Sequence, residues 1–186
     1  MNSPIIEPQY VTSLEEILWG GLLTGVTLTL HGIGMLYVVR MHGALKERFE
    51  KTPSFTTGMF VLVICAWMIL LAHLLEVFVW AGFFLWKGAV NTGSDTIPNA
   101  NSSLCYYFAL LDYTCLGSNF NLHTRWRLLE GGISMAGLLT FAWSTGVLMN
   151  LAQDFQDTQM QLLKLKRAKR HAKPGSTPAP MPVEAE

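Results

Sequence analysis

The chain has 186 residues, of which 51% are hydrophobic and 14% are charged, and this charged fraction lies well below the roughly 25% of an ordinary soluble domain. Its formal net charge is zero, so the composition argues against a nucleic-acid partner. The three cysteines, Cys65, Cys105 and Cys115, are not spaced as in a zinc site, and a helix between the last two would hold them too far apart for a disulfide.

Three long apolar runs dominate the sequence, at residues 17–39, 58–86 and 128–151. Each run exceeds the roughly 20 residues that cross a bilayer core as a helix. The sequence therefore predicts an all-α membrane protein with three transmembrane helices. Few acidic, basic or histidine side chains interrupt the runs: His31 in the first, His73 and Glu76 in the second, and Glu130 in the third.

Basic residues predict the orientation of these helices. Four follow the first run between residues 40 and 51, and six follow the third between residues 164 and 173, whereas the N-terminal segment carries acidic residues. Because basic segments stay in the cytoplasm, we expect the N-terminus outside and the C-terminus inside. Lys87, Arg125 and Arg127, in the second connection, oppose this assignment. Few features suggest a eukaryotic source, so the expected location is a bacterial inner (plasma) membrane.

A short helix is expected in the exterior connection between the second and third runs. Residues 91–103 are rich in Asn, Ser, Thr, Gly and Pro and predict an irregular loop. One of residues 101–103 can cap a helix over residues 104–114. That helix is too short to cross the membrane. It is either a re-entrant helix followed by a returning loop, or an interfacial helix that lies flat.

A helix that stops at membrane depth would place the negative end of its dipole there. Its last carbonyls, together with the carboxylate of Asp112, would stabilise a cation. Gly117 and Asn119 readily adopt positive φ and would let successive carbonyls point toward an axis. Physical chemistry alone therefore raises a cation pathway as a hypothesis.

The loop after this helix resembles the selectivity filter of the potassium-channel pore-domain family, which reads Thr-Thr-Val-Gly-Tyr-Gly. Residues 127–146, RLLEGGISMAGLLTFAWSTG, are similar to an inner pore helix with Gly137 as its hinge glycine. Residues 72–86 resemble the outer helix of bacterial two-transmembrane channel-like proteins, so the resemblance covers about residues 58–151. The filter-like ion pathway that it implies consists of Thr114, Cys115, Leu116, Gly117, Ser118 and Asn119.

The resemblance implies a homotetramer, because one chain offers one pore loop and four surround an axis. Thr140, Ser144 and Thr145 would then line a water-filled central cavity with their hydroxyl groups. The filter departs from the family pattern, since Cys115 offers sulfur in place of a hydroxyl oxygen and Ser118 replaces the tyrosine. These changes predict a weakly selective or non-conducting pore.

Two other functional classes are alternatives to a pore. A non-conducting accessory or scaffold subunit of a larger membrane complex suits the altered filter. A membrane enzyme or electron carrier would need a haem-attachment motif, intramembrane histidines at matched depth, or a nucleophile beside a base, and none is evident. We therefore expect no enzymatic activity, no cofactor and no metal. The expected partners are the lipid bilayer and monovalent cations.

His73 and Glu76 are three residues apart and share one helix face. They form either a metal or proton site or, as we favour, a hydrogen-bonded pair that ties the outer helix to a tyrosine of the short helix. His31 lies about 13 Å from Arg40 and His73 about 22 Å from Gly58. This depth difference of about 9 Å would strain a metal shared by the two histidines.

Glu130 is expected to pair with Arg127 or to line the outer mouth of a pore. The expected organisation has five parts: an exterior N-terminal segment (1–15), an extra transmembrane helix (16–40), a cytoplasmic loop (41–57), a pore-like domain (58–152) and a basic cytoplasmic tail with a disordered end (153–186).

Overall fold

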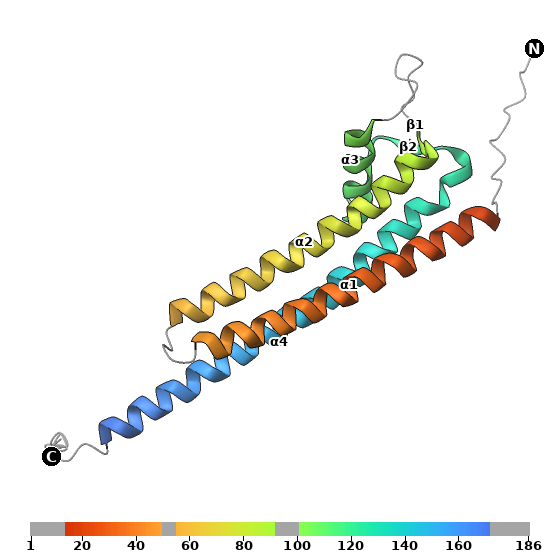
Figure 1. The fold of residues 1–186 in the computed structure, drawn as a ribbon. Helices are drawn as coiled ribbons and strands as arrows, with labels where there is room; N and C mark the ends of the chain where they lie inside the picture. The colour runs from red at the N-terminus through yellow and green to blue at the C-terminus, as the bar shows by residue number, and fades with distance from the viewer. Residues whose placement is uncertain (1–13, 50–54, 92–100, 172–186) are drawn as a thin grey trace, which may run out of the picture.

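The structure, a computed structural model, describes residues 14–49, 55–91 and 101–171. Three long helices make up most of it: α1 (Leu14–Phe49), α2 (Phe55–Lys87) and α4 (Leu128–His171). All three are long and apolar enough to cross a membrane, which confirms the predicted all-α membrane protein with three spans. They form an elongated bundle in which α1 packs against both α2 and α4 (Figure 1).

Two helices run well beyond their apolar runs. α1 continues to Phe49 and α2 begins at Phe55, so most of the segment 41–57, which was expected as a loop, is helical. α4 continues to His171. Both extensions are rich in Ala, Leu, Lys, Gln, Glu and Arg, which are strong helix formers. The basic tail is therefore a helix as far as residue 171, and the disordered end that the sequence predicts lies outside the described residues.

Small residues bring α1 close to its two neighbours. A Cβ atom at Gly34 would lie 3.2 Å from the Cβ of Ala72 on α2, and a Cβ atom at Gly32 would lie 3.3 Å from the Trp143 ring on α4. Close backbone approach allows van der Waals packing to hold helices together in a membrane, where the lipid tails are as apolar as the side chains. α1 is therefore an integral part of the bundle.

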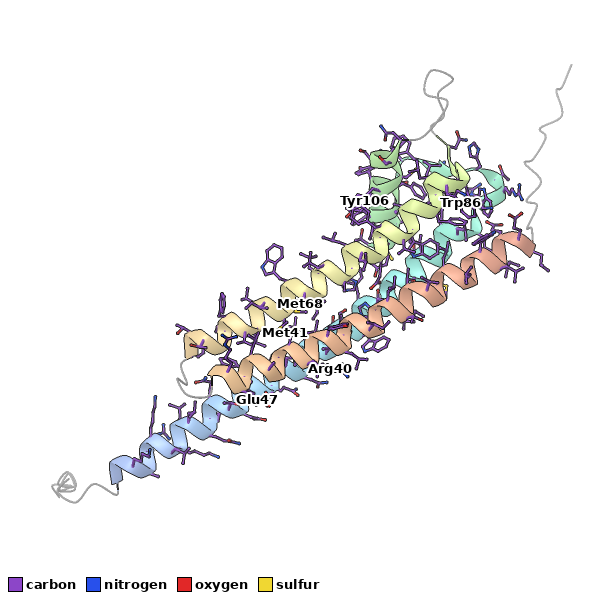
Figure 2. All side chains as sticks on the ribbon, viewed as in Figure 1. Arg40, Met41, Glu47, Met68, Trp86 and Tyr106 are labelled. Carbon is purple, nitrogen blue, oxygen red and sulfur yellow. The ribbon has the colours of Figure 1, made fainter. Side chains whose placement is uncertain are left out.

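An aromatic cluster surrounds a lysine at the end of the bundle where α2 ends. Lys87 Nζ lies 5.0 Å from the ring centroid of Trp19, 4.4 Å from that of Trp86 and 5.6 Å from that of Trp126. Such cation–π contacts each contribute about 0.5–1 kcal/mol at exposed sites. Trp86 marks this end of the bundle in Figure 2. A belt of amphipathic rings is typical of a membrane–water interface.

Acidic residues at the start of α1 fasten it to the start of α4. Glu15 forms ion pairs with Lys87 and with Arg125. The carboxylate of Glu16 accepts a hydrogen bond from the backbone N–H of Leu128, the first residue of α4. A carboxylate at this place satisfies a free N–H group and opposes the positive end of the helix dipole.

The connection between α2 and α4 contains a short helix and a small antiparallel sheet. Asn101 caps the short helix, because its side chain accepts a hydrogen bond of 2.8 Å from the N–H of Leu104. The short helix packs mainly on α2 and also on α4 (Figure 1). The elements are α3 (Ser102–Tyr113), the strands β1 (Val90–Asn91) and β2 (Asn121–Leu122), and a 3₁₀ turn (Thr124–Trp126).

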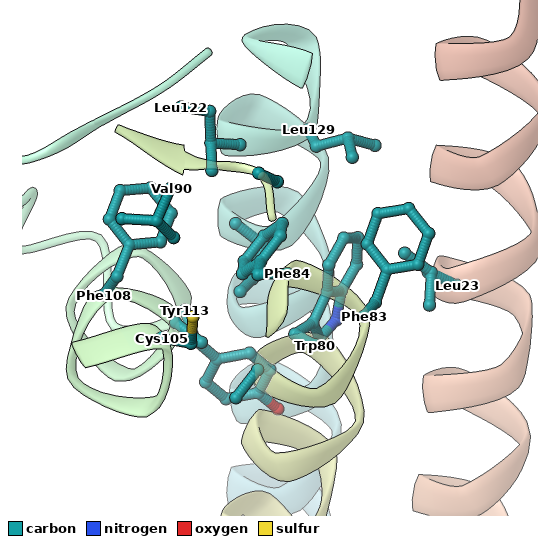
Figure 3. Packing of buried hydrophobic residues seen from close by; sticks show 14 of the residues in the cluster. Leu23, Trp80, Phe83, Phe84, Val90, Cys105, Phe108, Tyr113, Leu122 and Leu129 are labelled. Atoms are coloured by element: carbon teal, nitrogen blue, oxygen red, sulfur yellow. The ribbon is translucent and has the colours of Figure 1, made fainter. Parts of the chain in front are cut away.

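Aromatic side chains fill the core between α2 and α3. Trp80, Phe84 and Phe108 are fully buried, and the rings of Phe84 and Phe108 meet edge to face with centroids 5.5 Å apart. Val90 and Leu122, on the two strands, lie over these rings (Figure 3). Aromatic pairs in this geometry contribute about 0.5–1.5 kcal/mol beyond the burial of their area. This core fixes α3 against the bundle and so determines where α3 ends.

Smaller apolar side chains and an ion pair hold the opposite end, near Glu47 in Figure 2. Val38 on α1 and Cys65 on α2 belong to one buried apolar cluster. Lys46 Nζ lies 2.7 Å from the carboxylate of Asp154 on α4. An exposed ion pair of this kind contributes at most about 1 kcal/mol, so apolar packing dominates at this end.

Candidate functional site

α3 ends against the first third of α4. A Cβ atom at Gly137 would lie 1.9 Å from the carbonyl oxygen of Tyr113, and the phenol oxygen of Tyr113 lies 2.5 Å from Thr140 Oγ1. Gly137 and Thr140 are 9 and 12 residues beyond Leu128, where α4 begins, which corresponds to about 14–18 Å along the helix axis. The end of α3 thus contacts the apolar run 128–151 of α4 near the centre of that run.

The residues after α3 terminate it with two nested hydrogen bonds. The N–H of Leu116 donates to the carbonyl of Leu111 at 2.9 Å, and the N–H of Cys115 donates to the carbonyl of Asp112 at 3.0 Å. This arrangement is a Schellman motif, in which the left-handed residue is usually glycine. Here that residue is Cys115, with φ 59°. A side chain in this conformation costs roughly 1–2 kcal/mol, so the loop begins with a strained residue.

The segment expected as a filter, residues 114–119, is one continuous loop that leads from α3 back to β2. Gly117 has the expected positive φ of 72°, but Asn119 does not. Ser118 Oγ donates to the carbonyl of Phe120 at 2.6 Å. Leu116 is 75% exposed. The residues of the loop that are exposed on the single chain are Cys115, Leu116, Gly117 and Asn119.

Asp112 is buried rather than free at the end of α3. Its Oδ2 atom has no hydrogen-bond partner among the described residues. Burial, and after it the negative charge of Glu130, favour the neutral form of this carboxyl. Glu130 itself accepts a hydrogen bond of 2.8 Å from the N–H of Leu122, a partner that the sequence did not suggest.

Five side chains form a closed hydrogen-bonded ring at the level where α3 ends. Glu76 Oε1 lies 2.8 Å from His31 Nδ1, and Glu76 Oε2 accepts a hydrogen bond of 2.5 Å from the hydroxyl of Tyr113. His73 Nδ1 lies 3.0 Å from the same hydroxyl. Ser144 Oγ closes the ring, at 3.1 Å from His31 Nε2 and 3.0 Å from His73 Nε2. His73 and Glu76, which were expected as a pair, both contact the hydroxyl of Tyr113 on the short helix, and the ring joins all four α-helices.

His31 lies at the same level as His73, so the predicted offset of about 9 Å is wrong. The ring centroids of the two histidines are 5.1 Å apart. His31 lies 18 residues before the end of α1 at Phe49, and His73 lies 18 residues after the start of α2 at Phe55. The prediction measured depth from a charged residue on one helix and from an apolar one on the other. Antiparallel neighbours are aligned by the turn between them, and equal counts from that turn give equal depth.

Two polar residues of α4 that were expected in a central cavity belong to the interior of the single chain. Thr140 is fully buried and Ser144 is 5% exposed. Ser144 is a member of the ring, and Thr140 contacts its Tyr113 hydroxyl. Thr145, the third of the set, is exposed. The signal for this placement was in the sequence: Gly137, Thr140 and Ser144 lie at i, i+3 and i+7, on one face of α4. The polar groups of α2 required a polar face opposite them.

Comparisons with known proteins add no relative. No protein-family model matches the chain, and neither a curated protein nor a solved structure matches it. The resemblance to potassium-channel pore domains therefore rests on the residues quoted for it.

Proposed function

We propose that the protein is a membrane cation-channel-like protein in which several copies surround a pathway formed by residues 114–119. The placement of this loop carries the proposal. Hydrogen bonds to Glu76 and Thr140 hold Tyr113 against the apolar runs of α2 and α4, and the residues directly after it leave helical geometry. Irregular backbone at membrane depth is tolerated only where protein covers it or where it lines water.

A single chain does not cover the loop. Leu116, one residue beyond the strained Cys115, is 75% exposed. Other copies of the chain can cover one side of the loop and leave its carbonyls facing a shared axis. The resemblance implies four copies, each of which contributes one loop around a closed symmetry axis. The substitutions at Cys115 and Ser118 favour weak selectivity among monovalent cations.

A non-conducting subunit is the second candidate, and the end of α3 favours it. The carbonyl of Leu111 accepts from Leu116 and Thr114, and the carbonyl of Asp112 accepts from Cys115 and Ser134. Carbonyls that are engaged in this way offer less negative potential to a cation beyond the helix. The loop would then serve assembly rather than conduction.

Cys115 provides a test without any engineered label, because it is exposed while Cys65 and Cys105 are buried. The full chain is reconstituted in liposomes, and monovalent-cation flux is measured before and after a membrane-impermeant, positively charged methanethiosulfonate reagent. We expect flux that the reagent abolishes. The matched control is Cys115→Ser, which should conduct with a flux that the reagent does not change.

Three results separate the candidates. Reagent-sensitive flux supports a pore. Modification of Cys115 from the aqueous side without any flux supports the non-conducting subunit. Failure of the reagent to modify Cys115 in liposomes, while it modifies the same thiol in unfolded protein, contradicts the pore, because the loop then faces no water-filled pathway.

A further inference from the structure

The buried ring contains three side chains that are suited to hold a metal ion. His31, His73 and Glu76 each offer one coordinating atom, and these atoms lie within 4.8 Å of one another. All three residues are at most 6% exposed. We propose that these residues bind a divalent transition metal of the zinc class between α1 and α2.

The donor set selects the class of metal. Two imidazoles and one carboxylate suit zinc and its transition-metal neighbours, whereas magnesium and calcium prefer oxygen ligands alone. A tetrahedral zinc ion with bonds of about 2.0–2.1 Å holds its ligand atoms about 3.3 Å apart. His31 Nδ1 and Glu76 Oε1 are already 2.8 Å apart. A rotation of the His73 side chain would complete the set, since the three coordinating atoms lie within 4.8 Å of one another.

A count of hydrogens shows what the ring requires when Glu76 is ionised. Its five contacts each require one hydrogen. Two neutral imidazoles, one serine hydroxyl and one phenol supply four, and an ionised Glu76 supplies none. The shortage leaves two acceptors facing each other at one contact, which is costly in a buried site. Either a proton on Glu76 or a metal ion between the three ligands removes this conflict, and metal titration distinguishes the two.

With a metal in place, every remaining contact has its hydrogen. Ser144 Oγ contacts Nε2 of both histidines, so its two lone pairs can accept both Nε2–H groups, and both Nδ1 atoms are then free to coordinate. Tyr113 donates its hydrogen to Glu76 Oε2. Partners that orient ligating histidines in this way are a regular part of metal sites. The Tyr113 hydroxyl, 3.0 Å from His73 Nδ1, is also placed for the fourth coordination position.

The aromatic surroundings keep the site dry. The Phe141 ring lies 4.4 Å from the His73 ring, and the Trp143 ring lies 5.5 Å from the His31 ring, between centroids. Exclusion of water strengthens the attraction between the cation and Glu76. Because His31 comes from α1 and the other two ligands from α2, a bound metal would clamp these helices together.

The test uses the full chain in detergent after removal of metals with a chelator. Cobalt(II) and zinc(II) are titrated separately, with the visible spectrum of cobalt and the thermal midpoint of unfolding as readouts. We expect one equivalent of either metal, a cobalt spectrum of four-coordinate type, and a midpoint that rises with metal concentration.

Three substitutions locate the site. His31→Gln and His73→Gln should each lower the affinity by roughly 100-fold or more, and Ser144→Ala should lower it by about 10–100-fold. His42→Gln is the matched control, because His42 is a buried histidine of α1 that lies 4.0 Å from Asp154 rather than in the ring. It should leave the affinity unchanged.

X-ray absorption of the zinc-loaded wild-type chain covers the case in which a ring variant fails to fold. Two imidazole ligands on zinc support the proposal. The absence of stoichiometric binding, or equal binding in the wild type and in both histidine variants, overturns the proposal. The ring is then a structural element that holds a proton. Neither readout depends on ion flux, so this test is separate from the pore.

Discussion

The filter-like loop, residues 114–119, and the buried ring meet at Tyr113 but differ in the burial of their residues and in the partners that these residues find. In the ring, Glu76 and Ser144 each reach partners on two other helices, and every member is buried. In the loop, Cys115 and Leu116 are exposed on the surface of the chain. Buried polar groups without partners cost several kcal/mol. All members of the ring find their partners within one chain, whereas the loop leaves Cys115 and Leu116 uncovered.

The largest effect is expected from Glu76→Leu in the ring. The substitution removes the partner of His31 Nδ1 and one of the three partners of the Tyr113 hydroxyl in a buried site. We expect a loss of about 3–5 kcal/mol in the free energy of unfolding, measured by denaturation in detergent micelles. Glu47→Leu, at an exposed position of α1, should change stability by less than about 0.5 kcal/mol. Equal effects of the two substitutions would mean that the ring does not hold the bundle together.

Asp112, beside the loop, is expected to make stability depend on pH. Burial, and after it the negative charge of Glu130, favour the protonated carboxyl in the folded state. This contribution to stability is present at low pH and is lost as the carboxyl ionises in the folded protein at higher pH. Unfolding measured from about pH 4 to about pH 8 should show this decline in the wild type and a flatter profile in Asp112→Asn. Parallel profiles for the two proteins would contradict it.

Gly137→Ala should disturb the boundary between the two regions. The new Cβ atom would lie 1.9 Å from the carbonyl oxygen of Tyr113, and a backbone atom cannot turn aside. We expect a loss of about 1–3 kcal/mol together with a weaker Tyr113–Glu76 bond. The control is Gly146→Ala on the same helix, where the new atom meets nothing within 4 Å and should stabilise α4 by up to about 1 kcal/mol. The same sign for both changes would argue against a tight contact at Gly137.

The smallest effect on stability is expected in the loop itself. Ser118→Ala removes one partly exposed hydrogen bond to Phe120, which should cost less than about 1 kcal/mol. Ser144→Ala in the ring removes two buried bonds and should cost about 1–3 kcal/mol. Cation flux should respond in the reverse order if the loop forms the pathway. A larger loss of stability from Ser118→Ala would show that the loop is a structural element of the single chain.

The three spans and the short helix could be predicted from the sequence because each has a strong local cause. Charge is confined to segments between apolar runs, and Asn101 precedes a helical pattern as a cap. The C-terminal ends of α1 and α4 could not be predicted as well. The basic residues that follow the first and third apolar runs predict a cytoplasmic location, but they are also good helix formers and continue both helices. Those residues can be cytoplasmic and helical at once.

The ring was only half predictable. His73 and Glu76 share a helix face and required a polar partner, and a tyrosine of α3 was among the candidates. His31 was separated from them by a depth estimate that started from the wrong reference points. The Schellman motif at Cys115 had no sequence signal, since the left-handed residue of such a motif is usually glycine.

The contact between His31 and Glu76 lies within the first helical hairpin, and this has a consequence for biogenesis. Both residues leave the ribosome before α3 and α4 are made. A lone carboxylate on the second segment would resist partition from the translocon into lipid, but a hairpin that enters as a unit brings its own counter-group. Integration of α2 should therefore depend on a residue in α1, while Tyr113 and Ser144 arrive later and complete a polar centre that is already inside the bilayer.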